Sequence, residues 1–208
     1  MFDFSSLIVY ISAAFILLIT PGPAVIYIVT RTLNQGTAAG IFSIIGLTIG
    51  SFIYILTISF GVGALITESE LLFNIIKYLG AAYLIYLGVQ KIFFSKHITK
   101  EDDLVKGGLL QIMNNAILVS LLNPKSILFF LAFLPQFVDV NNGSVSLQLL
   151  LLGIIFLLIS FFTDGSYVLL AGKVRGWFKL KRNFLSAQNY ASGTVYILLG
   201  LFAAFSGN

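Results

Sequence analysis

Long apolar runs, separated by short polar segments, make up almost the whole chain. An α-helix needs about 20 apolar residues to cross the hydrocarbon core of a bilayer. The runs of about this length or longer are Phe4–Val29, Ala38–Ile66, Leu71–Phe94, Gly108–Val138, Val145–Ala171 and Ala187–Phe205. The pattern therefore predicts an all-α integral membrane protein with six transmembrane helices.

Prolines interrupt the first run at Thr20–Pro23 and the fourth run at Asn123–Ser126. A proline removes a backbone N–H donor, and its ring clashes with the carbonyl group one turn earlier. Inside a bilayer, broken backbone persists only where protein groups or a water-lined cavity satisfy the freed polar atoms. Two breaks at corresponding places predict a substrate site. Its predicted substrate-binding residues are Thr20, Pro21, Gly22, Pro23, Asn123, Pro124, Lys125 and Ser126.

A weak repeat relates the two halves of the chain. The breaks correspond, and after them Thr48–Ile53 resembles Thr163–Val168, while Gly80–Leu84 resembles Gly193–Ile197. Because each half holds three runs, the second half would enter the membrane from the opposite face, which is a 3+3 inverted repeat of the kind found in secondary transporters. We expect a single transporter domain over residues 1–208, with half-repeats at about 1–94 and 107–208 and a cytoplasmic loop at 95–106.

Lysine and arginine collect in alternate loops, which is the distribution that fixes membrane orientation. Arg31 is assigned to the first loop. The third and fifth loops, with their flanks, hold Lys91, Lys96, Lys100, Lys106, Lys173, Arg175, Lys179, Lys181 and Arg182. The odd-numbered loops are therefore expected in the cytoplasm and both termini outside. The net charge of +4 does not indicate nucleic-acid binding, because no basic patch is interleaved with aromatic residues on a foldable domain.

Composition narrows the classes of function. Of all residues, 58% are hydrophobic and 10% are charged, far from the composition of a soluble domain. Without cysteine the chain has no disulfide, thiol redox relay or cysteine-ligated metal, and its one histidine, His97, stands in a charged loop. We expect no enzyme activity, no cofactor and no metal site. A metal-ion exporter and a non-transporting membrane scaffold remain as alternatives to a transporter of organic molecules.

Asp164 is the acidic residue that stands deep inside an apolar run. A carboxylate at the bilayer centre costs about 2.5–3.5 kcal/mol on insertion scales, and such residues usually face the bundle interior as ion or proton sites. Asp164 is therefore the candidate for proton coupling. The alternative is an aspartate near a helix end that pairs with Lys173 or Arg175.

Lys125 has two interpretations. It could meet a substrate carboxylate or Asp164, or its long stem could lie along apolar surface while the ammonium reaches an interface. A helix that restarts at either break would present free N–H groups and a partial positive charge to an anion such as an amino-acid carboxylate. Elsewhere, Gly46 and Gly50 have the spacing of close helix packing, which favours contacts inside the bundle and leaves a homodimer face open.

Three blocks of sequence resemble those of the LysE/RhtB amino-acid exporters. They are Pro21-Gly22-Pro23, then Tyr78–Gly88, and finally Asn123–Ser126 continuing to Phe129-Phe130 and Leu134–Val138. The resemblance extends over nearly the whole chain. It implies a small multi-pass exporter of the bacterial inner membrane that moves amino acids or close derivatives and uses the proton gradient, with substrate, protons and membrane lipid as its partners. The shared blocks do not resolve basic from neutral substrates.

Overall fold

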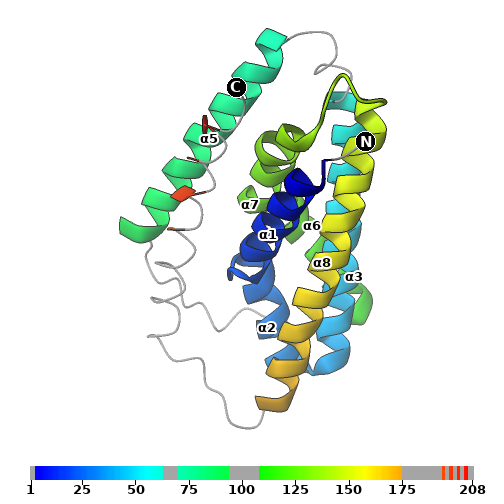
Figure 1. The fold of residues 1–208 in the computed structure, drawn as a ribbon. Helices are drawn as coiled ribbons and strands as arrows, with labels where there is room; N and C mark the ends of the chain where they lie inside the picture. The colour runs from blue at the N-terminus through cyan, green and yellow to red at the C-terminus, as the bar shows by residue number, and fades with distance from the viewer. Residues whose placement is uncertain are drawn as a thin grey trace.

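The computed structural model describes residues 3–62, 70–93 and 108–174, together with Thr194, Ile197, Leu198, Leu201, Ala204 and Phe205 (Figure 1). Helices account for most of these residues. The α-helices are α1 (Phe4–Ile19), α2 (Pro23–Gln35), α3 (Thr37–Thr57), α5 (Glu70–Phe93), α6 (Leu109–Leu121), α7 (Pro124–Leu128) and α8 (Val145–Val174). Two π-helical segments, η1 (Ile58–Val62) and η2 (Phe129–Phe133), and the 3₁₀-helix η3 (Leu134–Phe137) complete the list.

The described part of the chain contains two continuous helices long and apolar enough to cross a membrane, Thr37–Gly61 and Val145–Val174. Two bent pairs, α1 with α2 and α6 with its continuation to Phe137, pass the same test when each is taken as one span. The all-α membrane architecture is thus confirmed. The predicted loop 95–106 lies outside the described residues, as does most of the predicted run Ala187–Phe205. The count of six spans and the inverted repeat stay predictions.

Both predicted breaks are present. α1 gives way to α2 at Thr20–Gly22 with a bend of 48°, and Pro23 is the first residue of α2. α6 gives way to α7 at Asn123 with a bend of 55°, and Pro124 is the first residue of α7. Proline suits this first position because its missing N–H would have no intrahelical partner there.

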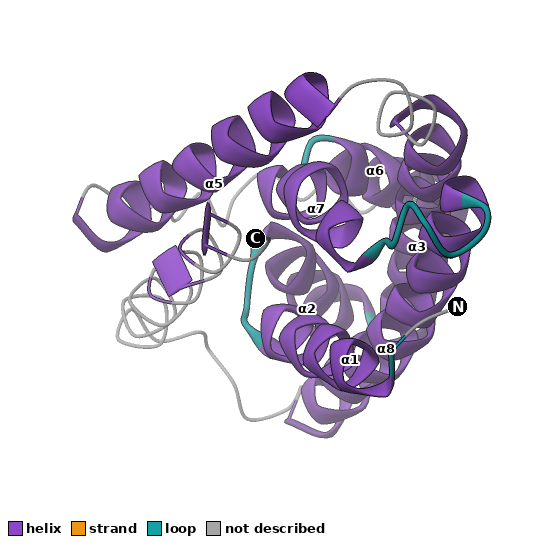
Figure 2. Ribbon diagram, turned by 45° about the horizontal axis from the view of Figure 1, so that its top comes forward, coloured by secondary structure: helices purple, strands orange, loops and turns teal. Residues whose placement is uncertain are grey.

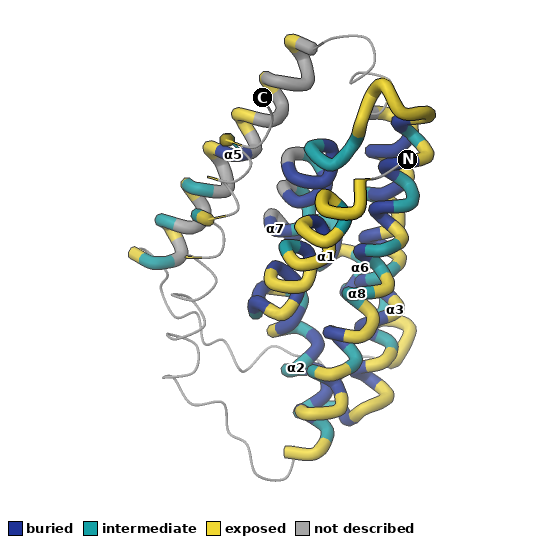
Figure 3. The backbone as a smooth tube through the Cα atoms, in the orientation of Figure 1, coloured by how far each residue is buried: buried dark blue, intermediate teal, exposed yellow. Residues whose placement is uncertain are grey.

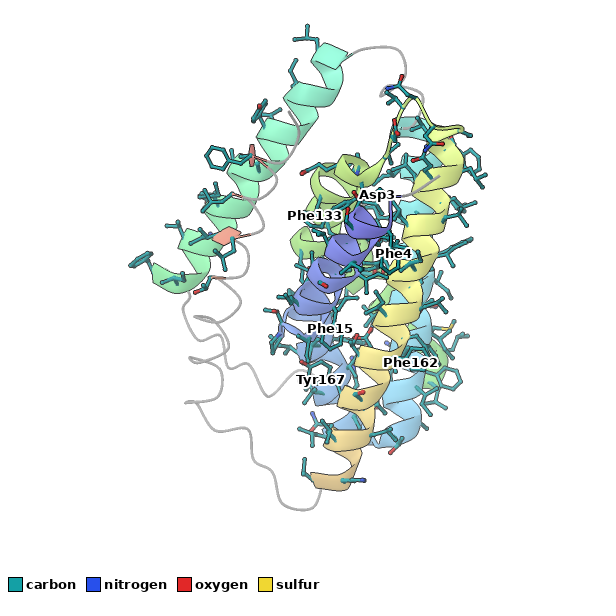
Figure 4. All side chains as sticks on the ribbon, viewed as in Figure 1. Asp3, Phe4, Phe15, Phe133, Phe162 and Tyr167 are labelled. Atoms are coloured by element: carbon teal, nitrogen blue, oxygen red, sulfur yellow. The ribbon has the colours of Figure 1, made fainter. Side chains whose placement is uncertain are left out.

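α3 packs most extensively, against α6, α8 and α2; α8 also packs against α1 and α2, and α5 lies to one side against α7 and η2 (Figure 2). Buried residues face the interior of the bundle, and the exposed outer surface is largely apolar (Figure 3). Phe15 on α1 and Phe162 on α8 are examples of exposed aromatic side chains (Figure 4). An apolar exterior of this kind suits contact with lipid.

Two apolar clusters form the core. We call the first the aromatic cluster; its buried members include Tyr10, Phe129, Phe130, Phe133 and Phe156. The second, the small cluster, consists among the described residues of Ile28, Ile44, Leu47, Ala116 and Val168. The aromatic cluster lies between α1, η2 and the first half of α8, and the small cluster lies between α2, the middle of α3, α6 and the second half of α8.

The assignment of Arg31 to a loop is wrong. α2 continues to Gln35, and Gly36, with a φ of 96°, alone separates α2 from α3. Arg31 is buried, and its guanidinium carbon lies 5.2 Å from the centre of the Tyr27 ring. The polar residues around Arg31 lower the local hydropathy, but they do not end the helix. The turn between α2 and α3 needs a residue that tolerates positive φ, and glycine is that residue.

Gly46 and Gly50 pack inside the chain, against α6. A Cβ atom added at Gly46 would clash with the carbonyl oxygen of Met113 and lie 2.7 Å from the Cβ of Ala116. A Cβ added at Gly50 would lie 2.8 Å from the Oγ of Ser120. These glycines allow α3 and α6 to approach closely, so their packing role is internal.

We expect Gly46→Ala to destabilise the protein by about 1–3 kcal/mol, the usual penalty for overpacking a filled core. The carbonyl of Met113 belongs to the α6 backbone and cannot turn away as a side chain could. Thermal unfolding in detergent measures the effect. Gly165→Ala is the matched control, since nothing lies within 4 Å of a Cβ added there. Equal melting temperatures for Gly46→Ala and Gly165→Ala would contradict the packing role.

Candidate functional site

A small cavity lies where the two helix breaks meet in the middle of the bundle. Its polar lining comes from Ser51, Ser120, Asn123, Lys125, Ser126, Ser160 and Asp164, and Gly22 lines it from the first break. The cavity has a volume of about 40 Å³. This is room for a few water molecules and far below the ~300–1,000 Å³ of pockets that hold drug-sized ligands. The hollow is therefore smaller than an amino acid.

Lys125 links the two breaks. Its side chain is 7% exposed, and its Nζ donates a hydrogen bond of 2.7 Å to the carbonyl oxygen of Thr20 at the end of α1. A cation is favourable at this position because the carbonyl end of a helix carries a partial negative charge. The interface interpretation of Lys125 is therefore wrong, since the ammonium lies inside the bundle.

Tyrosines satisfy other carbonyl groups beside the breaks. The hydroxyl of Tyr167 on α8 donates to the carbonyl of Ile19 at 2.6 Å, and the hydroxyl of Tyr54 on α3 donates to the carbonyl of Leu121 at the end of α6. Protein groups from neighbouring helices thus replace the hydrogen bonds that the interrupted helices lose, as broken backbone in a membrane requires.

Asp164 lies on α8 opposite the breaks and is 6% exposed. The hydroxyl of Ser160, one turn earlier, donates to its carboxylate at 3.0 Å, and Lys125 lines the same cavity. α8 continues to Val174, about 15 Å beyond Asp164 at ~1.5 Å per residue. The helix-end interpretation of Asp164 is therefore wrong: this carboxylate faces the cavity in mid-helix.

The two helix starts at the breaks differ. Asn123 caps α7, and its side-chain oxygen accepts the backbone N–H of Lys125 at 3.1 Å. Gly22 caps α2 without any side-chain hydrogen bond, and Ala24 and Val25, in the first turn of α2, line the cavity. The first N–H groups of a helix have no intrahelical partner. The start of α2 is thus the one that leaves donors for an anion.

Some of the predicted site residues line the cavity, and others only shape the helix ends beside it. Gly22, Asn123, Lys125, Ser126 and Asp164 line the cavity. Thr20 takes part through its carbonyl, while its hydroxyl donates to the carbonyl of Ile16 at 2.6 Å within α1. Pro23 is exposed, Pro21 is half-buried, and these two prolines with Pro124 define the ends of helices.

Sequence reasoning missed three serines that line the cavity, Ser51, Ser120 and Ser160. Serine in an apolar helix often bonds to the carbonyl one turn back, as Ser43 does to Ala39 at 2.8 Å. Nothing in the residue type or spacing separates the two situations. In the described ranges, no group of three or more His, Cys, Asp or Glu side chains could hold a metal ion.

The apolar clusters close the cavity toward both ends of the bundle. Phe156 lines the cavity and packs in a tilted arrangement on Phe129 with ring centres 4.5 Å apart, and the ring centre of Tyr10 lies 5.2 Å from that of Phe137. On the other side Leu47 lines the cavity and belongs to the small cluster. Beyond the aromatic cluster, Phe137 also borders an open hollow of about 340 Å³.

Comparison with known proteins agrees with this geometry. The model of the LysE type translocator family matches residues 15–207. A homoserine/homoserine lactone efflux protein of Salmonella typhimurium (strain LT2) is 32% identical over 195 residues, which cover 94% of each chain. Uncharacterized membrane proteins of Vibrio cholerae and Bacillus subtilis (strain 168) are also 32% identical, over 94% of this chain. No solved structure matches. The chain therefore belongs to the LysE type translocator family, whose members are transporters and not enzymes.

Proposed function

We propose that this protein exports a small amino acid or a close derivative across the bacterial inner membrane in exchange for protons. The family and the efflux proteins among its relatives support export of this kind of molecule. The observation that carries the proposal is one lysine and one aspartate, Lys125 and Asp164, that line a small polar cavity at two helix breaks.

A zwitterion complements this arrangement. The carboxylate of an amino acid would bind Lys125 and the first N–H groups of α2, since Lys125 and the residues at the start of α2 line the same cavity. The ammonium would bind the carboxylate of Asp164. In the other half of the cycle a proton from outside takes the place of the ammonium on Asp164, so substrate and proton alternate on one group.

Transport requires the two apolar clusters to open in turn. The cavity is too small for a substrate as it stands, so loading needs the helices to separate. Within the described residues the small cluster has fewer buried members than the aromatic cluster, and separating it exposes less apolar surface. We assign the small cluster to the cytoplasmic gate and the aromatic cluster to the outer gate, because Lys173 lies beyond Val168 on α8 and basic residues favour the cytoplasmic side.

The orientation follows from the charges at the two ends of the bundle. Asp3, the N-cap of α1, and Asp139 border one hollow, whereas Lys173 lies in the last turn of α8, where the neighbouring Gly172 packs against Thr37 at the start of α3. Since basic residues favour the cytoplasmic side, this supports termini outside and the small cluster on the cytoplasmic side. The bends of 48° and 55° support the six-span inverted repeat. Membrane lipid would cover the exposed apolar side chains, and a homodimer remains possible.

Efflux from vesicles tests the function. Purified protein is placed in vesicles loaded with a panel of labelled amino acids, and release is measured with and without an acid exterior. We expect release of some members of the panel, accelerated by the pH gradient. Release at the same rate with and without the pH gradient would overturn proton exchange. Release of none would favour the membrane scaffold, or a metal-ion exporter if loaded divalent cations leave instead.

A further inference from the structure

The hydroxyl group of Tyr10 links the middle of α1 to α8. Tyr10 is fully buried, and its hydroxyl donates to the carbonyl oxygen of Leu152 on α8 at 2.7 Å. Leu152 lies inside α8, where each carbonyl also accepts a backbone N–H within the helix. Tyr54 and Tyr167, in contrast, donate to carbonyls at helix ends. The bond of Tyr10 can therefore open without leaving a carbonyl of α8 unpaired.

A second set of bonds holds the segment between η3 and α8. Gln148 on α8 is fully buried, and its side-chain oxygen accepts the backbone N–H of Asp139 at 3.0 Å. Its Nε2 donates to the carbonyls of Asp139 at 2.8 Å and of Asn142 at 3.2 Å. Nearer the cavity, Phe156 of α8 packs on Phe129 of η2 with ring centres 4.5 Å apart. These contacts join η2, η3 and α8 at two levels, so we expect the three elements to move together.

α1 is placed differently, at the surface of the bundle (Figure 3). It packs chiefly against α8 and η3, and its outer face is exposed, for example at Ile8. Its end at the first break is fixed, because the side chains of Tyr167 and Lys125 donate to its last carbonyl groups. Residues at the ends of helices are the usual hinges of such motions. The rest of α1 can therefore tilt away from α8 about this break.

We propose that Tyr10 is the latch of the outer gate: α1 tilts away from α8 about the first break to open the aromatic cluster, while η2, η3 and α8 stay together. The inference rests on the proposed function for the assignment of this cluster to the outer side. α1 has 16 residues, so its length is about 24 Å, and a tilt of ~15° moves its far end by ~6 Å. This motion separates the ring of Tyr10 from those of Phe129 and Phe137, whose centres lie 6.0 and 5.2 Å away.

Distances between spin labels identify the moving element. The chain has no cysteine, so pairs of cysteines at exposed positions can be labelled without background. Phe162→Cys on α8 is the common reference, combined either with Ile8→Cys on α1 or with Val140→Cys after η3. Full-length protein in lipid nanodiscs is measured with Tyr10 and with Tyr10→Phe. With Tyr10→Phe we expect a distance longer by ~6 Å between α1 and α8, about fivefold more populated, the value of one neutral hydrogen bond.

The distance between Val140 and Phe162 should stay the same in both proteins. A longer distance for this pair would overturn the proposal, because the segment after η3 would then be the part that moves. Identical distances with and without the hydroxyl of Tyr10, in both pairs, would overturn it as well. Release of no amino acid by the wild-type protein in the vesicle assay would overturn the proposed function and leave the measured distances as they are.

Labelling from outside tests whether this motion opens the cavity. Ser51→Cys places a thiol of similar shape in the cavity wall, and a membrane-impermeant thiol reagent is added to intact cells. Tyr10→Phe should raise the labelling rate about fivefold. Tyr27→Phe is the matched control, because its hydroxyl donates at 2.8 Å to the carbonyl of Ile112 inside α6 and its ring packs on the small cluster. Equal labelling rates for Tyr10→Phe and Tyr27→Phe would overturn the latch.

Discussion

Asp164→Asn is expected to abolish efflux driven by a pH gradient while the protein remains folded and inserted. Asparagine has nearly the same shape as aspartate and can still accept the hydrogen bond from Ser160, 3.0 Å away in the wild type. It cannot take up and release a proton in the physiological range. Coupling should therefore be lost without loss of the local structure around the cavity.

The measurement compares release from vesicles with and without an acid exterior, alongside thermal unfolding in detergent. Asp139→Asn is the control, because Asp139 is an exposed carboxylate that borders the open hollow next to Phe137 and does not line the central cavity. We expect the control to respond to the gradient as the wild type does. If Asp164→Asn also responded fully, the proton would have to be carried by another group.

Lys125→Met should weaken substrate binding by about tenfold or more. Methionine keeps a flexible, largely apolar stem but removes the ammonium, and a hydrogen bond to a charged group contributes about 1.5–3 kcal/mol. The change also leaves the carbonyl of Thr20 without its 2.7 Å bond from Nζ. An unpaired buried acceptor costs about 1–3 kcal/mol, so the free energy of unfolding should fall as well.

The substrate concentration that gives half-maximal release from vesicles and the melting temperature are therefore measured on the same protein. Lys173→Met is the control, since Lys173 is exposed near the end of α8 and far from the cavity. A Lys125→Met protein with a lower melting temperature but an unchanged half-saturation would limit Lys125 to a structural role, joining the two breaks. An unchanged melting temperature together with weaker binding would show that substrate recognition dominates.

Some features of the site could be predicted because they arise from the chemistry of single residues. Proline cannot donate a backbone hydrogen bond, so the breaks at Pro21 and Pro124 follow from the residue type wherever the helices lie. A carboxylate such as Asp164 is too costly to face lipid, so its position toward the interior also follows. The location of Arg31 could not be obtained in this way, because hydropathy reports burial in lipid and does not distinguish a loop from a buried polar turn of helix.

The sequence by itself thus determined the membrane class, the family, the two breaks and the one buried acid of the cavity. Only the tertiary structure decided that Lys125 reaches across to Thr20, that Ser51 meets Ser120 and that two apolar clusters close the cavity. The physical reason is that an apolar helix satisfies its own backbone hydrogen bonds and presents similar apolar side chains on every face. Which serine turns inward, and which carbonyl a lysine finds, depends on the neighbouring helix and how closely its glycines let it approach.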